Sequence, residues 1–337
     1  MIKTLLYEKL DNQKVRCLIC NHFCVIDDKK RGICKVRENQ NGTLFNLVYP
    51  KIIANSVDPI EKKPIFHLKP GSFSYSIATV GCNFKCAFCQ NSNIAHMPSD
   101  RNGLIQGTNI SPETIVLDAL RANCKSISYT YTEPTIFFEL AFETAKLAKQ
   151  NGLLNVFVTN GYMSDQALDM ILPYLDAANV DLKAFDDKFY QTYCKAKIEP
   201  VKNNIKKMKD NNVLVELTTL LIPELNNDKE QIRQMSEFIA QDIGKDTPWH
   251  ISRFHPSYKV NNIGATLISD LEYACKIGID AGLQYVYMGN VAGQPYEHTY
   301  CPNCKTLVIK RYGYKTEDLL KDNGKCPQCD TIIYGIY

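Results

Sequence analysis

The stretch Gly81-Cys82-Asn83-Phe84-Lys85-Cys86-Ala87-Phe88-Cys89-Gln90-Asn91 decides the fold. Its three cysteines have the spacing C-x3-C-x2-C and follow an apolar run at residues 74–80 that predicts a strand. An iron–sulfur cubane usually takes four thiolates, so three thiolates on one short loop leave one iron open. Because a catalytic metal site keeps an open position for an outside ligand, the loop predicts a catalytic [4Fe–4S] cluster on Cys82, Cys86 and Cys89.

Two other kinds of site compete with this prediction. A zinc site with three cysteines needs a fourth ligand, for which His96 is a candidate, and a ferredoxin-type cluster needs no open iron. The natural ligand of an open iron is S-adenosylmethionine (SAM), through its amino and carboxylate groups. One electron then releases a 5′-deoxyadenosyl radical, which abstracts hydrogen from an unactivated carbon.

Downstream of the cysteine loop, the sequence alternates between strand and helix patterns. Such β-α repeats predict a parallel sheet with right-handed crossovers, so we expect an α/β fold that is a full or partial (βα) TIM-like barrel. Further strands are expected at residues 126–131, 153–159, 177–182, 213–222, 250–254 and 283–288, separated by helices at 112–123, 135–151, 165–175, 187–209, 228–242 and 269–281. Ser111 and Asp228 are expected to cap two of these helices.

Polar residues follow the predicted strands, where the active sites of parallel barrels lie. Glu133 can pair with an ammonium group, Lys183 with a carboxylate, and Asp181 with ribose hydroxyls, which together match SAM. The Thr159-Asn160-Gly161 segment belongs to the same ring, although it could be only a turn. An electron-transfer protein would leave Glu133, Asp181 and Lys183 unexplained.

Two further groups of cysteines lie at the ends of the chain. Cys301, Cys304, Cys326 and Cys329 form paired C-x2-C knuckles, which predict structural zinc, with a rubredoxin-like iron site as the alternative. Cys17, Cys20, Cys24 and Cys34 have the spacing C-x2-C-x3-C-x9-C, which suits zinc or an auxiliary [4Fe–4S] cluster. The remaining cysteines are interpreted as core fillers: Cys124, Cys194 and Cys275.

Composition limits the location and partners of the chain. Its 337 residues include 14 cysteines but neither a leader-like N-terminus nor an apolar run long enough to span a membrane, so we expect a cytoplasmic protein with reduced thiols. A net charge of +3 without a basic patch argues against nucleic-acid binding. We expect an N-terminal metal-binding module with four cysteines at 1–50, a connector at 51–73, the barrel at 74–292 and a zinc-ribbon-like module, also with four cysteines, at 293–337.

These motifs resemble the radical SAM superfamily over nearly the whole chain. Within it, the sequence is similar to the pyruvate formate-lyase activating enzymes and, more closely, to the radical SAM member of the AmmeMemoRadiSam system. Besides the three cysteine groups, the resemblance is carried by residues 58–64 (DPIEKKP), 131–135 (YTEPT), 179–183 (NVDLK), 249–256 (WHISRFHP) and 286–290 (VYMGN).

The resemblance implies a site for SAM and one departure from the family pattern. It implies that Thr132 and Glu133 hold the SAM amino group and that an aromatic ring lies beside adenine. The activating enzymes place an aspartate before the Thr-Asn-Gly turn as part of a cation site, whereas this sequence has Val158. Further SAM contacts implied by the resemblance are Phe88, Thr159, Asn160, Asp181, Lys183 and His255.

The expected function is therefore a radical SAM enzyme that abstracts hydrogen from a protein, peptide or metabolite. The alternatives are an activase for a glycyl-radical enzyme and a non-catalytic zinc-ribbon binding protein. The chemistry also calls for a low-potential electron donor, for which we expect a ferredoxin or flavodoxin.

Overall fold

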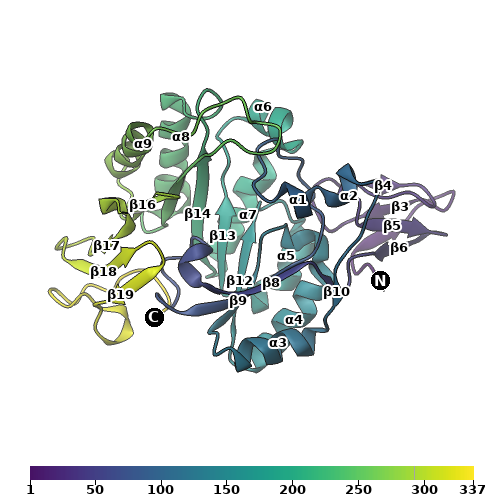
Figure 1. The fold of residues 1–337 in the computed structure, drawn as a ribbon, viewed down its shortest axis with the longest axis horizontal. Helices are drawn as coiled ribbons and strands as arrows, with labels where there is room; N and C mark the ends of the chain where they lie inside the picture. The colour runs from purple at the N-terminus through teal and green to yellow at the C-terminus, as the bar shows by residue number, and fades with distance from the viewer. Residues whose placement is uncertain (292) are drawn as a thin grey trace.

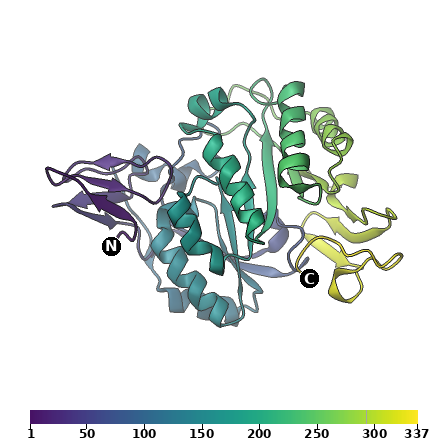
Figure 2. The same cartoon turned by 180° about the vertical axis from the view of Figure 1, so that it is seen from behind.

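The structure is a computed structural model that describes residues 1–291 and 293–337. Residue 292, the expected end of the barrel, lies outside the described residues. Three parts follow one another along the chain: small sheets at the N-terminus, a central α/β unit, and a small sheet at the C-terminus. The two terminal parts lie at opposite sides of the central unit (Figures 1 and 2).

A sheet of eight strands forms the centre of the molecule. Its order is β16-β15-β14-β13-β12-β11-β9-β8, and every neighbouring pair is parallel except β8 and β9. Because β16 and β8 are its two edges within the described residues, the barrel is partial, as the repeats allowed. The strands are β8 Ala54–Pro59, β9 Phe73–Ala78, β11 Ser126–Tyr129, β12 Leu154–Thr159, β13 Ala177–Asp181, β14 Leu214–Leu221, β15 Trp249–Arg253 and β16 Val286–Gly289.

The seven parallel strands match the predicted ones closely, whereas β8 was expected to be part of a connector. β8 is an edge strand with exposed residues at its centre, so it lacks the apolar pattern that marks the buried strands. It forms because its backbone pairs with that of β9, with Ser56 opposite Ser76 and Asp58 opposite Ser74. The connector also contains the 3₁₀ turn η1 (Ile60–Lys62).

Helices connect the strands and cover the outer face of the sheet (Figure 1). The Ser111 side chain accepts a hydrogen bond from Thr114 N, and the Asp228 side chain accepts bonds from Glu230 N and Gln231 N, so both predicted caps are confirmed. The helices are α1 Ser92–Ala95, α2 Met97–Asp100, α3 Pro112–Arg121, α4 Phe138–Gln150, α5 Asp165–Ile171, α6 Asp187–Phe189, α7 Glu199–Asp210, α8 Lys229–Phe238 and α9 Ile268–Asp280.

Short turns complete several of these helices. The pattern at 187–209 is broken, as expected near Pro200, into α6, a π-helical turn and α7. The 3₁₀ turns are η2 Pro134–Phe137, η3 Leu172–Tyr174, η6 Pro295–Glu297 and η7 Asp322–Gly324, and the π-helical turns are η4 Tyr190–Cys194 and η5 Ile239–Gly244.

The terminal modules are small antiparallel sheets. The N-terminal part has the orders β1-β6-β5 and β2-β3-β4, while β7 (Lys51–Ile52) pairs with β10 (Thr108–Asn109). The C-terminal part has the order β17-β18-β19 and is tied to the connector, because His67 O accepts from Ile336 N at 2.7 Å. Their strands are β1 Ile2–Lys3, β2 Tyr7–Lys9, β3 Val15–Cys17, β4 Val25–Ile26, β5 Arg37–Gln40, β6 Thr43–Asn46, β17 Thr299–Tyr300, β18 Leu307–Tyr312 and β19 Lys315–Asp318.

Among the described residues, we find no helix that combines the length and the apolar character needed to span a bilayer.

Candidate active site

One cavity lies at the carboxyl ends of the parallel strands. Its volume is about 420 Å³, within the roughly 300–1,000 Å³ typical of sites for small ligands. It brings together the three cysteines of the loop after β9 and polar residues that follow β11, β12 and β13. All but one of the predicted site residues of the barrel line it: Cys82, Cys86, Phe88, Cys89, Thr132, Glu133, Thr159, Asn160, Asp181 and Lys183.

The cysteine loop is held in place by backbone hydrogen bonds to a π-helical turn. Lys85 N donates to Cys194 O at 2.8 Å, and Ala87 N donates to Tyr193 O at 2.9 Å. Ser257 Oγ donates to Cys89 O from the far side at 3.2 Å. Turns of this π-helical kind are frequent at functional sites. The loop is therefore shaped by the chain from two later parts of the barrel before any ligand binds.

The positions of the loop thiols fit a multi-iron cluster better than a single zinc ion. A zinc ion draws its thiolates together, since each lies about 2.3 Å from the metal. Within residues 1–291 and 293–337, Cys82, Cys86 and Cys89 form no group whose ligand atoms all lie within 4.8 Å of one another. His96, the alternative zinc ligand, is buried and stacks on Tyr258 instead of lining the cavity. The spacing of the loop thiols is therefore wider than a single zinc ion requires.

Glu133 connects the ends of two strands. Its Oε1 accepts from Thr135 N (3.1 Å), Thr135 Oγ1 (2.5 Å) and Thr159 Oγ1 (2.7 Å), and its Oε2 accepts from Asn160 N (2.7 Å). Burial raises the pKa of Glu133 above its usual range, against the opposing effect of these hydrogen bonds. The carboxylate thus fixes the loops after β11 and β12 and also faces the cavity.

Asp181 and Lys183 form an ion pair in the cavity wall. Lys183 Nζ lies 2.8 Å from Asp181 Oδ2 and 5.9 Å from the centroid of the Phe88 ring. Burial lowers the pKa of Lys183, but Asp181 outweighs it and holds the pKa well above its usual value. The site therefore presents a carboxylate, an ammonium group and an aromatic ring side by side.

Three other residues singled out from the sequence are placed as follows. His255 is exposed and is not among the residues that line the cavity. Thr132 lines the cavity, but its Oγ1 donates to Thr79 O at 2.8 Å. Val158 lines the cavity and brings no carboxylate to the place of the cation site of the activating enzymes.

A charged cluster that was not predicted from the sequence borders the cavity, and its members Lys62, Lys63 and Tyr131 line the wall. Asp58 at the end of β8 binds Lys62 Nζ at 2.8 Å and Lys63 Nζ at 2.5 Å, and it accepts from the Tyr131 hydroxyl. Although burial raises the pKa of Asp58, hydrogen bonds from the two lysines and Tyr131 hold it well below its usual range. Burial lowers the pKa of Lys63 to about 8, against the effect of Asp58. The Asp-x3-Lys-Lys spacing could have indicated the ion pairs within this cluster. The third partner of Asp58, Tyr131, lies far along the chain and could not be inferred from this spacing.

Cys194, interpreted as a core or near-surface filler, is fully buried in the main hydrophobic core, as expected. Its side chain also lies next to that of Cys86, one of the three predicted cluster ligands. Cys124 and Cys275 are buried and belong to the main hydrophobic core, as expected.

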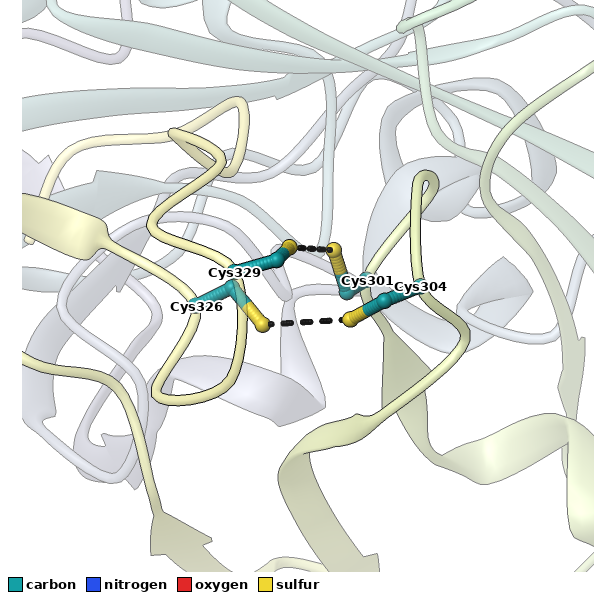
Figure 3. A group of neighbouring side chains, drawn as sticks. All are labelled: Cys301, Cys304, Cys326 and Cys329. Atoms are coloured by element: carbon teal, nitrogen blue, oxygen red, sulfur yellow. Dashed lines mark hydrogen bonds between the residues drawn. The ribbon is translucent and has the colours of Figure 1, made fainter.

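The C-terminal cysteines form a second candidate metal site, and Figure 3 shows their four sulfur atoms facing one another. Cys301 Sγ lies 3.6 Å from Cys329 Sγ, and Cys304 Sγ lies 3.6 Å from Cys326 Sγ. The two knuckles repeat the same turn, because Lys305 N donates to Cys301 O and Asp330 N donates to Cys326 O. Four thiols at this spacing suit a single tetrahedral ion.

Comparisons with known proteins agree with this geometry. Residues 76–237 match the radical SAM superfamily. A relative from Methanocaldococcus jannaschii, assigned by name to the glycyl-radical enzyme activating enzymes, is 30% identical over 193 residues, 56% of this chain and 75% of the relative. The chain belongs to the radical SAM superfamily. It is therefore an enzyme of the class that uses a [4Fe–4S] cluster and SAM.

Two further similarities concern the extent of the match. An uncharacterized protein of M. jannaschii is 43% identical over 335 residues, 99% of both chains. A radical SAM methyltransferase from Sphaerobacter thermophilus has a TM-score of 0.50 at 14% identity, covering 65% of this chain and 67% of that chain. The structural likeness shows the fold alone, whereas the alignment with the sequence relative spans nearly the whole chain, both terminal modules included.

Proposed function

We propose that the cavity at the carboxyl ends of the strands binds a [4Fe–4S] cluster and SAM, and that the enzyme abstracts hydrogen from a protein, peptide or metabolite substrate. The observation that carries this proposal is that three loop cysteines and SAM-compatible polar groups, from four consecutive strands of the sheet, line one cavity. When bound, the reduced cluster supplies the electron that cleaves SAM to a 5′-deoxyadenosyl radical.

The residues of this chain divide the recognition of SAM between them. Glu133 accepts hydrogen bonds from the amino group, Lys183 pairs with the carboxylate, and Asp181 accepts from the ribose hydroxyls. The Phe88 ring offers an apolar face to adenine. The hydrogen bonds from Thr159 and Asn160 keep Glu133 in place, so these two residues act as positioning groups.

Formation of 5′-deoxyadenosine tests this function. The protein is purified without oxygen, reduced, and mixed with SAM, and the products are analysed by mass spectrometry. We expect 5′-deoxyadenosine. Absence of the product from protein with a reduced cluster, together with absence of SAM binding in equilibrium dialysis, would contradict the proposal.

The variant Asp181→Asn is expected to weaken SAM binding about tenfold to a hundredfold. The change removes a charged acceptor worth roughly 1.5–3 kcal/mol and leaves Lys183 without the partner it now holds at 2.8 Å. Titration calorimetry with SAM measures the effect. Asp242→Asn, at the exposed pair with Lys206, is the matched control and should bind SAM like the wild type.

A glycyl-radical activase is the second candidate function. It is favoured by the name of the 30%-identical relative, which matches 56% of this chain. In that case, the hydrogen would come from a glycine of a partner protein. An added glycyl-radical enzyme would then gain a glycine-centred radical signal in electron paramagnetic resonance (EPR) spectra.

We further propose that Cys301, Cys304, Cys326 and Cys329 bind structural zinc. The sulfur separations of 3.6 Å are close to those around one ion with metal–sulfur distances of about 2.3 Å. Cys304→Ser should lower the zinc content by about one ion per chain without changing the iron content. Zinc content unchanged in this variant, or iron in place of zinc in the wild type, would contradict the assignment.

A further inference from the structure

The four N-terminal cysteines surround a second cavity. It measures about 20 Å³, more than the roughly 10–15 Å³ that one water molecule needs. Cys17, Cys20, Cys24 and Cys34 all line it. Much of the remaining wall is apolar and comes from Ile19, Ile26, Ile33 and Ile136. The thiols therefore enclose a chamber instead of closing on one point.

The sulfur separations distinguish this chamber from the C-terminal site. Four thiolates around one zinc ion must lie within about 3.8 Å of one another, because each is about 2.3 Å from the metal. The C-terminal thiols come close to this condition, with two pairs at 3.6 Å and all four sulfur atoms within 4.8 Å of one another. Within the described part of the chain, no three N-terminal thiols lie within 4.8 Å of one another. Thiolates on the four different irons of a cubane are farther apart than thiolates on one ion, so the N-terminal spacing favours a cubane.

Polar groups on the wall suit the sulfur atoms of such a cluster. Asn83 is 1% exposed, and its Oδ1 accepts from Asn160 Nδ2 at 2.8 Å. Its buried Nδ2 has no hydrogen-bond partner among the described residues, so a donor is left at the chamber. Hydrogen bonds to cluster sulfurs are one of the ways in which proteins tune such sites. The buried guanidinium group of Arg37 also lines the chamber, where its charge is paired with Glu139 at 2.8 Å.

The chamber adjoins the cysteine loop of the active site. Gly81 has a φ of +105°, and a Cβ there would lie 2.6 Å from Val36 Cγ1 and 3.4 Å from the carbonyl oxygen of Cys34. His22 Nε2 lies 2.9 Å from Asn83 O. Asn83 lines the chamber, and its chain neighbour Cys82 lines the SAM cavity. The cysteine loop thus contributes to the walls of both cavities.

We infer that Cys17, Cys20, Cys24 and Cys34 bind a second [4Fe–4S] cluster next to the first. The identity of this cluster is argued from the N-terminal chamber and its wall, whereas the position beside a first cluster rests on the proposed function. The second cluster has four thiolate ligands and no open iron, so it does not compete for SAM.

Metal analysis of a variant without the loop thiols tests the inference. The triple variant Cys82→Ala, Cys86→Ala, Cys89→Ala is purified without oxygen and without chemical reconstitution, which avoids adventitious iron. We expect about four iron and four acid-labile sulfide per chain, together with about one zinc from the C-terminal site. The same variant with Cys20→Ala and Cys24→Ala added should lose the iron and keep the zinc. Two zinc and no iron in the triple variant would overturn the inference.

Spectroscopy of the unmodified protein covers the case in which the variants do not fold. Mössbauer spectra should assign about eight irons per chain to cubane clusters, whereas about four would overturn the inference. In the reduced protein, the EPR signal should be broadened by interaction between the two adjacent clusters, and the triple variant should show a sharp signal from one cluster. A lack of both 5′-deoxyadenosine and SAM binding with eight irons present would contradict the proposed function while leaving this inference intact.

Discussion

Cys86→Ala is expected to abolish formation of 5′-deoxyadenosine. Cys86 is the central ligand of the proposed three-thiolate set, and it is buried at 8% exposure in the cavity wall. Without it, a cubane would have only two protein ligands on the loop, too few to hold the cluster with one iron facing the cavity. The loss should exceed a thousandfold, to the background of the mass-spectrometric assay, and the zinc content should stay unchanged.

The neighbouring thiol of Cys194 calls for a second variant. Because it contacts Cys86, it could replace the lost ligand, and residual activity in Cys86→Ala should then vanish in the double variant with Cys194→Ala. Cys275→Ala is the matched control. This buried cysteine lies in α9 and lines neither the SAM cavity nor the N-terminal chamber. Full activity in the double variant would show that the loop does not hold the catalytic cluster.

The parallel strands could be predicted from the sequence because they are buried on both faces. β14, for example, is apolar or buried at nearly every position. Such a strand can be recognised from its own residues, without knowledge of the strands that flank it. The edge strand β8 could not be predicted in this way. Its central residues are exposed, and only pairing with β9 defines it.

The residues of the candidate site that directly follow a predicted strand could be predicted from the sequence. Glu133, Asp181 and Lys183 lie at carboxyl ends of strands, and parallel strands bring these ends together. The cluster of Asp58 and Lys63 with Tyr131 depends on a contact between distant segments, which no local pattern encodes. The metal at the N-terminal cysteines was open for the same reason, because sequence spacing does not fix the distances between sulfur atoms.

Glu139→Ala is expected to lower the stability of the protein by about 3–5 kcal/mol. Glu139 in α4 and Arg37 in β5 are 0% and 2% exposed, and they join through two hydrogen bonds of 2.8 and 2.9 Å. The change would leave the guanidinium group buried without its counter-charge, and Asn46 Nδ2 would lose its bond to the carboxylate at 2.6 Å. Denaturant unfolding of the protein with its metals bound measures the effect.

Glu237→Ala is the matched control, because the pair of Glu237 and Arg233 is half-exposed and lies on one helix. Such surface pairs contribute at most about 1 kcal/mol. A similar stability loss in the two variants would show that the buried pair has no special role.

The ion pair of Glu139 and Arg37 is also expected to make the stability of the N-terminal module depend on pH in the acid range. Burial raises the pKa of Glu139, but Arg37 outweighs it, so the folded pKa lies below its ordinary value. A carboxyl with a lowered pKa stabilises the fold above its unfolded pKa of about 4.3, and this contribution is lost as the pH falls further.

Limited proteolysis should therefore release residues 1–50 from the wild type in acid, and from Glu139→Ala already at neutral pH. Since Arg37 also lines the N-terminal chamber, the same variant should lose the metal bound by the N-terminal cysteines first. Resistance of the variant to proteolysis at neutral pH would mean that the thiol-bound metal, and not the ion pair, holds the module on the barrel.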